Sequence, residues 1–411
     1  MRFKNIVKTA FKQALSRRII LDNLILRNKK FRAYLLNKYK YPLFDLILKD
    51  QKVDHFAKTL ILLKPDAIGD YILFRNFLFD LKKSAKFVGY RIAFVGNESV
   101  KELAEYLDKS SVDLFIWINR SKFINDFNYR FEVTSTIQNL KAEYLINPVY
   151  SREYHLDFCQ TITKYSGAKY RIAHQGDLHL PPHLNNNLRE SNKYYNAFIP
   201  GNPTVLFEFY RNKEFFEGLL ENKLNVKFQI DFSERITNHP YIILFPGAQV
   251  AFREWSQEKY RDCLEVILKK SNFDIYICGP KKDEEKALSL INQLKSGKIK
   301  NFCGNTDLID VLKLIYNAHL IIVNESGMAH LAAALNKSYI CISNGNHYGR
   351  FHPYPKEINN TGYYVYHDEL LSGSYSETEL KYWYKFESFL DINEIEFNKV
   401  EILLTNIRED L

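Results

Sequence analysis

The chain has 411 residues, 46% of them hydrophobic, and a formal net charge of +9 at pH 7. This length and composition exclude a fibrous or wholly disordered protein and suffice for two domains of roughly 150 to 200 residues with apolar cores. The positive charge favours acidic partners, such as nucleotides, phosphorylated lipids, membrane surfaces or nucleic acid. No run reaches the roughly 18 apolar residues of a spanning helix and no signal-peptide pattern occurs, so we expect a cytoplasmic protein, soluble or peripheral on a membrane.

The basic excess is concentrated at the start of the chain, where we expect a helical extension over residues 1–57. Lysine and arginine are interleaved with apolar residues there, for example Arg17, Arg18, Lys29 and Lys30. A basic amphipathic segment of this kind can lie on an anionic membrane, where each cation contributes about 1 kcal/mol. Alternatively, it packs on the body of the protein with a solvated basic face, and the sequence leaves both readings open.

An alternation of strands and helices begins near Thr59. The strand candidates are residues 59–64, 91–96, 113–118, 143–148 and 169–174, and helical stretches begin near Tyr71, Glu98 and Asp126. This pattern predicts a parallel sheet covered by helices. We expect this N-terminal domain to span residues 58–235, with the Asn- and Pro-rich residues 179–203 as a loop and residues 207–222 as a helix.

A second alternation begins at Tyr241. Its strand candidates are residues 241–245, 274–279, 319–323 and 338–343, and its helix candidates are 256–270, 283–295, 307–318 and 328–335. We expect a second doubly wound domain, residues 236–375, that faces the first. The remaining residues, 376–411, have a mostly helical pattern and are expected to cross back to the first domain.

The cysteines do not suggest a metal site. There are five, none in a Cys-x-x-Cys spacing, and most fall in segments with a core pattern. We therefore expect reduced, buried thiols and no metal ligation. They are Cys159, Cys263, Cys278, Cys303 and Cys341.

The loop after the first strand brings a carboxylate to the edge of the sheet at which ligands bind in open α/β folds. Gly69 permits a close approach to the backbone, and Asp70 stands where a helix begins. Asp70 can act there as a general base, a role worth about 10²- to 10⁴-fold in rate. Alternatively, Asp70 or Asp66 is only the N-cap of the helix.

Two strand ends in the C-terminal domain suit a nucleotide. The loop that contains Gly247 and Ala248 precedes Arg253, and its small residues, free N–H groups and cation suit a diphosphate. The alternative is a surface arginine stacked on Trp255. Asp283, after the next strand, can bind ribose hydroxyls, but acids are also what any helix N-terminus prefers.

A third strand end is the stretch NESGMAHLAAAL, residues 324–335. Ser326 is a candidate N-cap, and Gly327 allows close backbone approach. Backbone N–H groups at such a helix start attract anions or sugar hydroxyls. A capped turn without a ligand is the alternative.

These segments together resemble the ADP-heptose:lipopolysaccharide heptosyltransferases, glycosyltransferase family 9. The similarity covers roughly residues 58–355 and is strongest in residues 301–335 and in IILFPGAQVAFREWS, residues 242–256. IGDYIL, residues 68–73, and SGAKYRIAH, residues 166–174, resemble two further motifs of the family. The resemblance implies the GT-B architecture, two facing Rossmann-like domains with a cleft between them.

The resemblance also implies roles for individual residues. Asp70 becomes the catalytic base of an inverting transfer, and Arg253 the cation on the donor diphosphate. Gly69 and Gly247 support the loops. The remaining donor-binding positions are Ala248 and Gln249 beside the phosphates, Asp283 with Glu284 as an alternative at the nucleoside, and Glu325, Ser326, Gly327 and His330 with Thr306 nearby.

The implied function is metal-independent transfer of a sugar, with heptose from ADP-heptose expected, onto a lipopolysaccharide or lipooligosaccharide core, without a cofactor. The implied partners are a nucleotide-diphosphate sugar, a lipid-linked or core oligosaccharide and the inner-membrane surface, but no nucleic acid. Two departures from the family pattern, Arg253 for lysine and Glu325 for aspartate, motivate an alternative, a non-catalytic sugar-nucleotide binder or assembly subunit. A nucleotide-sugar epimerase of the same architecture is a further alternative.

Overall fold

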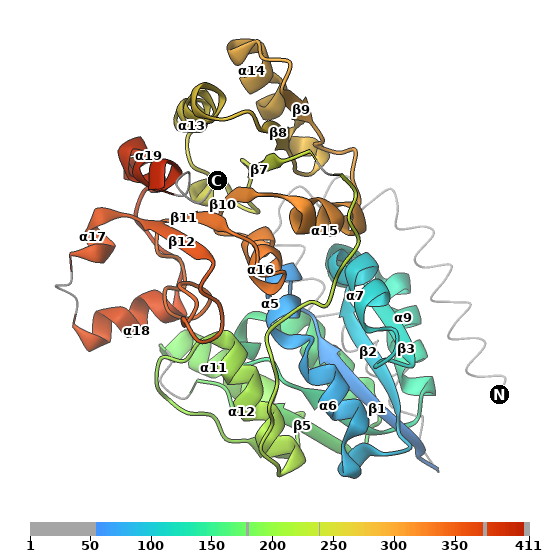
Figure 1. Cartoon of the computed structure of the whole chain (residues 1–411). Helices are drawn as coiled ribbons and strands as arrows, with labels where there is room; N and C mark the ends of the chain where they lie inside the picture. The colour runs from blue at the N-terminus through green and yellow to red at the C-terminus, as the bar shows by residue number, and fades with distance from the viewer. Residues whose placement is uncertain (1–54, 178–180, 238, 373–375, 407–411) are drawn as a thin grey trace, which may run out of the picture.

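The computed structural model describes residues 55–177, 181–237, 239–372 and 376–406 and consists of two α/β domains, one above the other in Figure 1. Each domain is built on one six-stranded sheet in which all neighbouring strands are parallel. The predicted fold class, two facing Rossmann-like domains, is therefore confirmed. The predicted basic extension, residues 1–57, lies almost wholly outside the described residues.

The N-terminal sheet has the strand order β3-β2-β1-β4-β5-β6. Residues Leu60 to Leu63 of β1 are fully buried because helices cover both faces of the sheet. The strands are β1 (Ala57–Lys64), β2 (Arg91–Asn97), β3 (Leu114–Ile118), β4 (Ala142–Asn147), β5 (Tyr170–His174) and β6 (Ala197–Ile199). The helices are α5 (Ile68–Phe74), α6 (Phe77–Lys83), α7 (Lys101–Asp108), α8 (Arg120–Asn125), α9 (Phe127–Asn139), α10 (Thr161–Tyr165), α11 (Pro182–Asn192) and α12 (Glu208–Leu220).

The prediction of a loop over residues 179–203 was wrong. Residues 182–192 form α11, which starts with Pro182 in its first turn, where a missing N–H costs nothing. Residues 197–199 form β6, the edge strand that pairs with β5. The many asparagines conceal a helix whose Leu184 and Leu188 are buried, four residues apart on one face.

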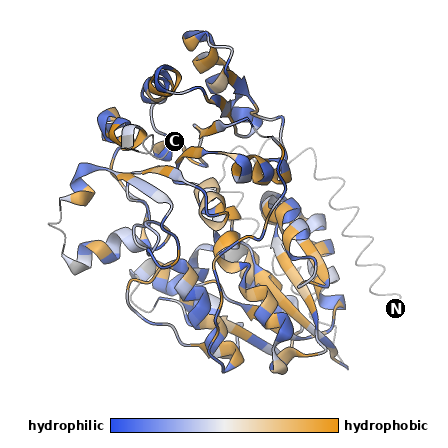
Figure 2. Cartoon of the chain, in the orientation of Figure 1, coloured by the Kyte–Doolittle hydropathy of each residue, from blue (hydrophilic) through white to orange (hydrophobic). Residues whose placement is uncertain are grey.

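The C-terminal sheet has the order β12-β11-β10-β7-β8-β9, so β7 and β10 are neighbours at its centre. Figure 2 shows that hydrophobic positions gather in the strands of both sheets and on the helix faces that cover them. The strands are β7 (Tyr241–Phe245), β8 (Asp274–Ile277), β9 (Ile299–Asn301), β10 (Leu320–Asn324), β11 (Tyr339–Ser343) and β12 (Gly362–Tyr366). The helices are α13 (Gln257–Lys270), α14 (Glu284–Leu294), α15 (Leu308–Asn317) and α16 (Gly327–Ala334).

The part of the chain that follows β12 contains α17 (Asp368–Leu371), α18 (Glu377–Lys385) and α19 (Phe397–Asn406). Tyr384 of α18 donates a hydrogen bond to the carbonyl of Leu206, 2.6 Å away and next to α12, whereas α19 packs on α13 of the C-terminal domain. This segment therefore contacts both halves of the molecule. No described helix is both long and apolar enough to cross a membrane.

The two domains meet where α5 and α16 lie side by side at the centre of the molecule (Figure 1). Glycines allow this close approach: a Cβ on Gly69 would lie 2.6 Å from Cδ2 of His330, and one on Gly327 would lie 3.1 Å from Ile68. A hydrogen bond from the N–H of Leu308 to Glu102, 3.0 Å, joins the start of α15 to α7. The carboxyl ends of the two sheets therefore face each other.

Candidate functional site

A cavity of about 800 Å³ lies between the two domains. The loop after β1 and the residues after β2 line its N-terminal side, and the loops after β7, β8, β9 and β10 line the other side. The carboxyl ends of parallel strands are where open α/β sheets bind ligands. The predicted site residues that line the cavity are Gly69, Gly247, Ala248, Gln249, Asp283, Thr306, Ser326 and Gly327.

Helices α5, α15 and α16 begin at this cavity. Ser326 caps α16 by accepting a hydrogen bond from the N–H of Met328, as its position in the sequence predicts. Asp307 caps α15 in a reciprocal pair with Asp310. The helix starts bring partial positive charge to one place, which suits an anionic ligand.

Two side chains hold the loop after β7 by hydrogen bonds to the backbone of Ala248. Its N–H donates to Glu254, 3.0 Å away, and its carbonyl accepts from Lys282, 2.7 Å away. The N–H of Ala248 is therefore already paired and is not one of the free N–H groups predicted for this loop. Lys282 was not predicted as a site residue, but it lines the cavity and places a cation beside the loop; its position just after a strand end was the available signal.

Asp283 lies beneath the same loop, and its carboxylate packs against two glycines. A Cβ on Gly247 would lie 2.0 Å from Oδ2 of Asp283, and one on Gly279 would lie 3.0 Å from it. Asp283 is buried, with Lys286 at 3.4 Å as its ion-pair partner. Glu284, the alternative to Asp283 at the nucleoside, pairs with Lys281 at 2.6 Å and is not among the residues that line the cavity.

Arg253 and Glu325 lie close enough to interact electrostatically, although neither is among the described cavity-lining residues. Burial raises the pKa of Glu325, while the charge of Arg253 and a hydrogen bond from Ser343 lower it. Arg253 also contacts Glu387 at 3.4 Å, and its guanidinium lies 5.5 Å from the ring centroid of Phe252. The alternative that Arg253 stacks on Trp255 does not hold in this structure.

His330 faces the interior. Its Nδ1 lies 2.6 Å from the hydroxyl of Tyr354, and its ring stacks on His352 with centroids 4.6 Å apart. Burial lowers the pKa of His330 to about 3, so the ring is neutral. On its other side the ring packs against Gly69, so His330 sets how closely α16 approaches α5.

Asp70 lies in the first turn of α5, directly after the cavity-lining Gly69. Burial, and then the negative charge of Asp66, raise the pKa of Asp70 to about 6, whereas Lys64 opposes the shift. A carboxylate with this pKa is suited to general base catalysis near neutral pH. The N-cap of α5 is Ala67, so neither aspartate caps the helix.

Asp66 is fixed by two side chains. Lys64 donates to it at 2.7 Å, and Nε2 of His155 lies 3.0 Å from its other oxygen. Burial raises the pKa of Asp66, but these two partners outweigh it and leave the pKa below its usual range. Asp66 therefore stays ionised next to Asp70 and strengthens the affinity of Asp70 for a proton.

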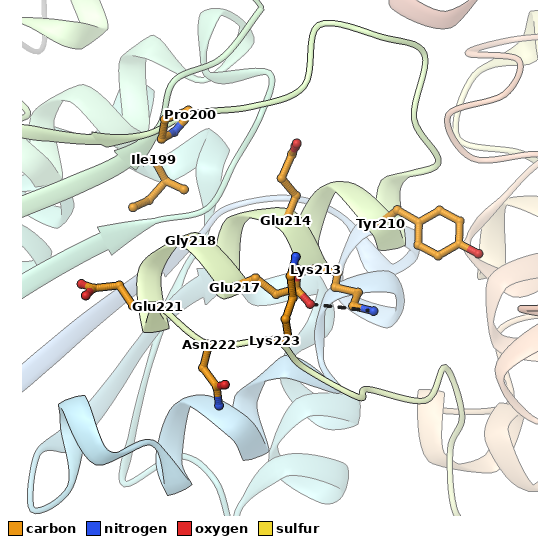
Figure 3. Close-up of a pocket in the computed structure, with 10 residues that line it drawn as sticks. All are labelled: Ile199, Pro200, Tyr210, Lys213, Glu214, Glu217, Gly218, Glu221, Asn222 and Lys223. Carbon is orange, nitrogen blue, oxygen red and sulfur yellow. Dashed lines mark hydrogen bonds and ion pairs between the residues drawn. The ribbon is translucent and has the colours of Figure 1, made fainter.

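A second hollow, of about 650 Å³, lies along α12 on the outside of the N-terminal domain (Figure 3). Both lysines that line it pair with one of its glutamates: Glu217 lies 3.8 Å from Lys213 and 2.9 Å from Lys223. We assign no ligand to it. No group of three or more candidate metal-binding side chains occurs among residues 55–177, 181–237, 239–372 and 376–406.

Comparison with known proteins shows a similarity to one family. Residues 203–372 match the model of glycosyltransferase family 9 (heptosyltransferase). This part of the chain is therefore similar to that family. Lipooligosaccharide heptosyltransferase 2 of Haemophilus ducreyi is 35% identical over 117 residues, which are 26% of this chain and 32% of that protein. Lipopolysaccharide heptosyltransferase 2 of Escherichia coli is 26% identical over 110 residues, 26% of this chain and 31% of that protein, so the alignments span about a third of these relatives.

Solved structures show that the chain has the GT-B fold over most of its length. ADP-heptose lipopolysaccharide heptosyltransferase II of E. coli superimposes with a TM-score of 0.59 and 14% identity, over 86% of this chain and 100% of that chain. The E. coli heptosyltransferase WaaC with ADP-2-deoxy-2-fluoro heptose superimposes with a TM-score of 0.62 and 14% identity, over 85% of this chain and 99% of that chain. A family 9 glycosyltransferase of Veillonella parvula superimposes with a TM-score of 0.62 and 16% identity, over 87% of this chain and 98% of that chain.

Proposed function

We propose that this protein is an inverting glycosyltransferase that moves heptose from ADP-heptose onto a lipopolysaccharide or lipooligosaccharide core. The main support is the cavity between the domains, with a carboxylate of raised pKa beside it on one side and three helix or loop termini suited to a nucleotide diphosphate on the other. The match to the family model and the similarity to heptosyltransferases support the sugar and the acceptor.

In the proposed reaction, Asp70 accepts the proton of an acceptor hydroxyl as that oxygen attacks the anomeric carbon of the donor. The new C–O bond forms opposite the breaking bond, whose electron pair passes to the diphosphate, so the configuration inverts. The growing negative charge is stabilised by the starts of α15 and α16 and by Lys282 and Arg253. Because these protein groups supply the positive charge, we propose that no divalent metal is needed.

The donor nucleoside is expected near Asp283, whose carboxylate lies under the loop after β7. The acceptor approaches from the N-terminal domain, on the side of Asp70. Since such acceptors are lipid-linked, we propose that the protein works peripherally at the cytoplasmic face of the inner membrane. The basic residues 1–57 are the proposed contact with that surface.

The test is transfer by the variant Asp70→Asn. We expect donor binding, followed by the thermal shift that ADP-heptose produces, to remain nearly unchanged, because Asp70 faces the acceptor. Transfer, measured as ADP release with a heptose-deficient core oligosaccharide, should fall by about 10²- to 10⁴-fold. Asp80→Asn, in the first turn of the neighbouring α6, is the matched control.

Two results would contradict the proposal. Full transfer by Asp70→Asn would remove the base assignment. Donor binding by the wild type without transfer or donor hydrolysis would favour the alternative of a non-catalytic nucleotide-sugar binder. Parallel screening of ADP-, UDP- and GDP-sugars tests the nucleotide, since a ligand at 100 times its Kd stabilises the protein by about 2.7 kcal/mol.

A further inference from the structure

A buried ion pair joins the two domains beside the proposed base. Arg350 belongs to the loop after β11 in the C-terminal domain, and Glu208 is the first residue of α12, which packs on α5 and α6. Nε of Arg350 donates to Oε2 of Glu208 at 2.8 Å, and the N–H of Glu208 donates to the carbonyl of Arg350 at 2.8 Å. A second guanidinium nitrogen donates to the hydroxyl of Ser151, 3.1 Å away, after β4.

This contact is specific in its geometry. Arg350 is 6% exposed and Glu208 is 2% exposed, so water screens their charges little. Three hydrogen bonds join Arg350 to the N-terminal domain, two of them with Glu208 and one with Ser151. A buried arginine and glutamate contribute little net stability compared with apolar residues of the same size, which makes a role beyond stability worth testing.

We propose that Arg350 is a positioning residue that, together with Glu208, controls the ionisation of the Asp70 carboxyl and does so only while the two domains are in contact. The cation comes from the C-terminal domain, whereas both carboxylates belong to the N-terminal domain. Separation of the domains would remove this cation and leave the carboxylate of Glu208 without its ion-pair partner near Asp70. Contact between the domains would therefore keep the base ionised when the donor is enclosed.

The electrostatic surroundings of Asp70 agree with this. Burial raises the pKa of Asp70 most; of the neighbouring charges, Asp66 and Glu208 raise it further, and Lys64 and Arg350 lower it. Reciprocally, Glu208 and, more weakly, Asp70 raise the pKa of Arg350.

Other titratable groups also face this cluster. Arg211 interacts with Glu208, and Tyr150, Glu153 and His347 interact with Arg350. His330 of α16 packs on the adjacent Gly69 and is neutral, because burial lowers its pKa to about 3. Tyr384 of α18 faces Arg350, and His155 faces Asp66. None of them supplies the cation that Arg350 brings from the C-terminal domain.

This inference rests on the proposed function, in which Asp70 is the base. It can be tested without an activity assay, because the titration of Asp70 can be measured directly. The full-length protein is labelled with [4-¹³C]aspartate, and the Asp70 signal is assigned by its loss in Asp70→Asn. Its pH midpoint is then compared between variants. Arg350→Gln removes a cation and should raise the midpoint by on the order of one pH unit, whereas Glu208→Gln removes an anion and should lower it by a similar amount.

Two further variants make the test robust. Loss of one partner of a buried ion pair can unfold a protein, so the double variant Arg350→Gln/Glu208→Gln, which removes both charges, should fold and return the midpoint towards the wild-type value. Arg350→Lys keeps the positive charge, so the pH midpoint of Asp70 should stay close to the wild-type value. Arg75→Gln breaks another Arg–carboxylate pair, with Asp108 at 2.7 Å inside the N-terminal domain, and is the control for general destabilisation.

Opposite shifts in the two single variants support the proposal. The proposal is overturned if the pH midpoint of Asp70 in Arg350→Gln and Glu208→Gln equals that in the control Arg75→Gln. It is also overturned if the midpoint moves in the same direction in both variants. The proposed function fails separately, if Asp70→Asn transfers heptose at the wild-type rate while the titrations behave as expected. In an active enzyme, the acid limb of kcat/KM should move with the same sign as the midpoint.

Discussion

The contact between Gly69 and His330 gives the sharpest prediction about the distance between the domains. In Gly69→Ala, the new methyl group would lie 2.6 Å from Cδ2 and 3.1 Å from Nε2 of His330. The ring cannot easily turn away, because Tyr354 is hydrogen-bonded to its Nδ1 at 2.6 Å and His352 stacks on it. Ordinary carbon contacts are about 3.5–4.0 Å, so α5 and α16 must separate by about 1 Å.

Overpacking of this kind costs about 1–3 kcal/mol, and a shift of about 1 Å in a positioned site can cost on the order of 10²-fold in rate. We therefore expect Gly69→Ala to lower the unfolding midpoint modestly and to reduce transfer strongly. Thermal unfolding and kinetics with ADP-heptose measure both effects. The double variant Gly69→Ala/His330→Ala removes the clash and should recover part of the lost rate.

Gly297→Ala is the matched control, because a Cβ there would meet nothing within 4 Å. If Gly69→Ala transfers heptose as fast as Gly297→Ala, the proposed dependence of the reaction on the α5–α16 contact is refuted. If the double variant is slower than Gly69→Ala, the clash with His330 is not the cause of the loss.

Two further predictions concern the pH profile and the donor loop. Since the base must be ionised and the pKa of Asp70 is raised to about 6, kcat/KM should be constant near pH 8 and fall tenfold per pH unit well below pH 6; an acid limb centred near pH 4 would exclude Asp70 as the titrating base. In Gly247→Ala the methyl group would lie 2.0 Å from the Asp283 carboxylate, so the donor loop must move and KM for ADP-heptose should rise at least tenfold, about 1.4 kcal/mol. A wild-type KM in that variant, measured beside Gly297→Ala, would contradict the placement of the donor.

Much of the fold could be predicted because the central strands are nearly unbroken apolar runs. Leu320 to Val323 is such a run, and it forms the buried centre of β10. The edge strands are different: β12 contains Gly362 and exposed Tyr363 and pairs on one side only, so its pattern does not separate it from a loop. Elements at an edge are defined mainly by their neighbours, which a single sequence does not reveal.

The same distinction applies to the site. Residues directly after a strand, such as Gly247 and Ser326, could be placed because parallel strands end at a common edge. Glu208 and Arg350 could not, because they are 142 residues apart in sequence and each resembles an ordinary surface charge until folding brings them together. Lys282 was hidden for a related reason, since a lysine at a helix start is usually solvated.

The structure also suggests why Glu325 can replace the aspartate of the family pattern. Its N–H donates to the carbonyl of Ile342, 3.0 Å away in β11, and its carboxylate accepts a hydrogen bond from Ser343 at the end of the same strand. The longer side chain is thus directed along β11 and beside Arg253, behind the described lining of the cavity. In the proposed reaction we therefore expect Glu325 to act on the charge of Arg253, and the donor to contact Ser326, Gly327 and the N–H groups of α16. A glutamate there is then compatible with transfer, because the residue it serves is an arginine whose forked guanidinium can face a carboxylate and a diphosphate at the same time.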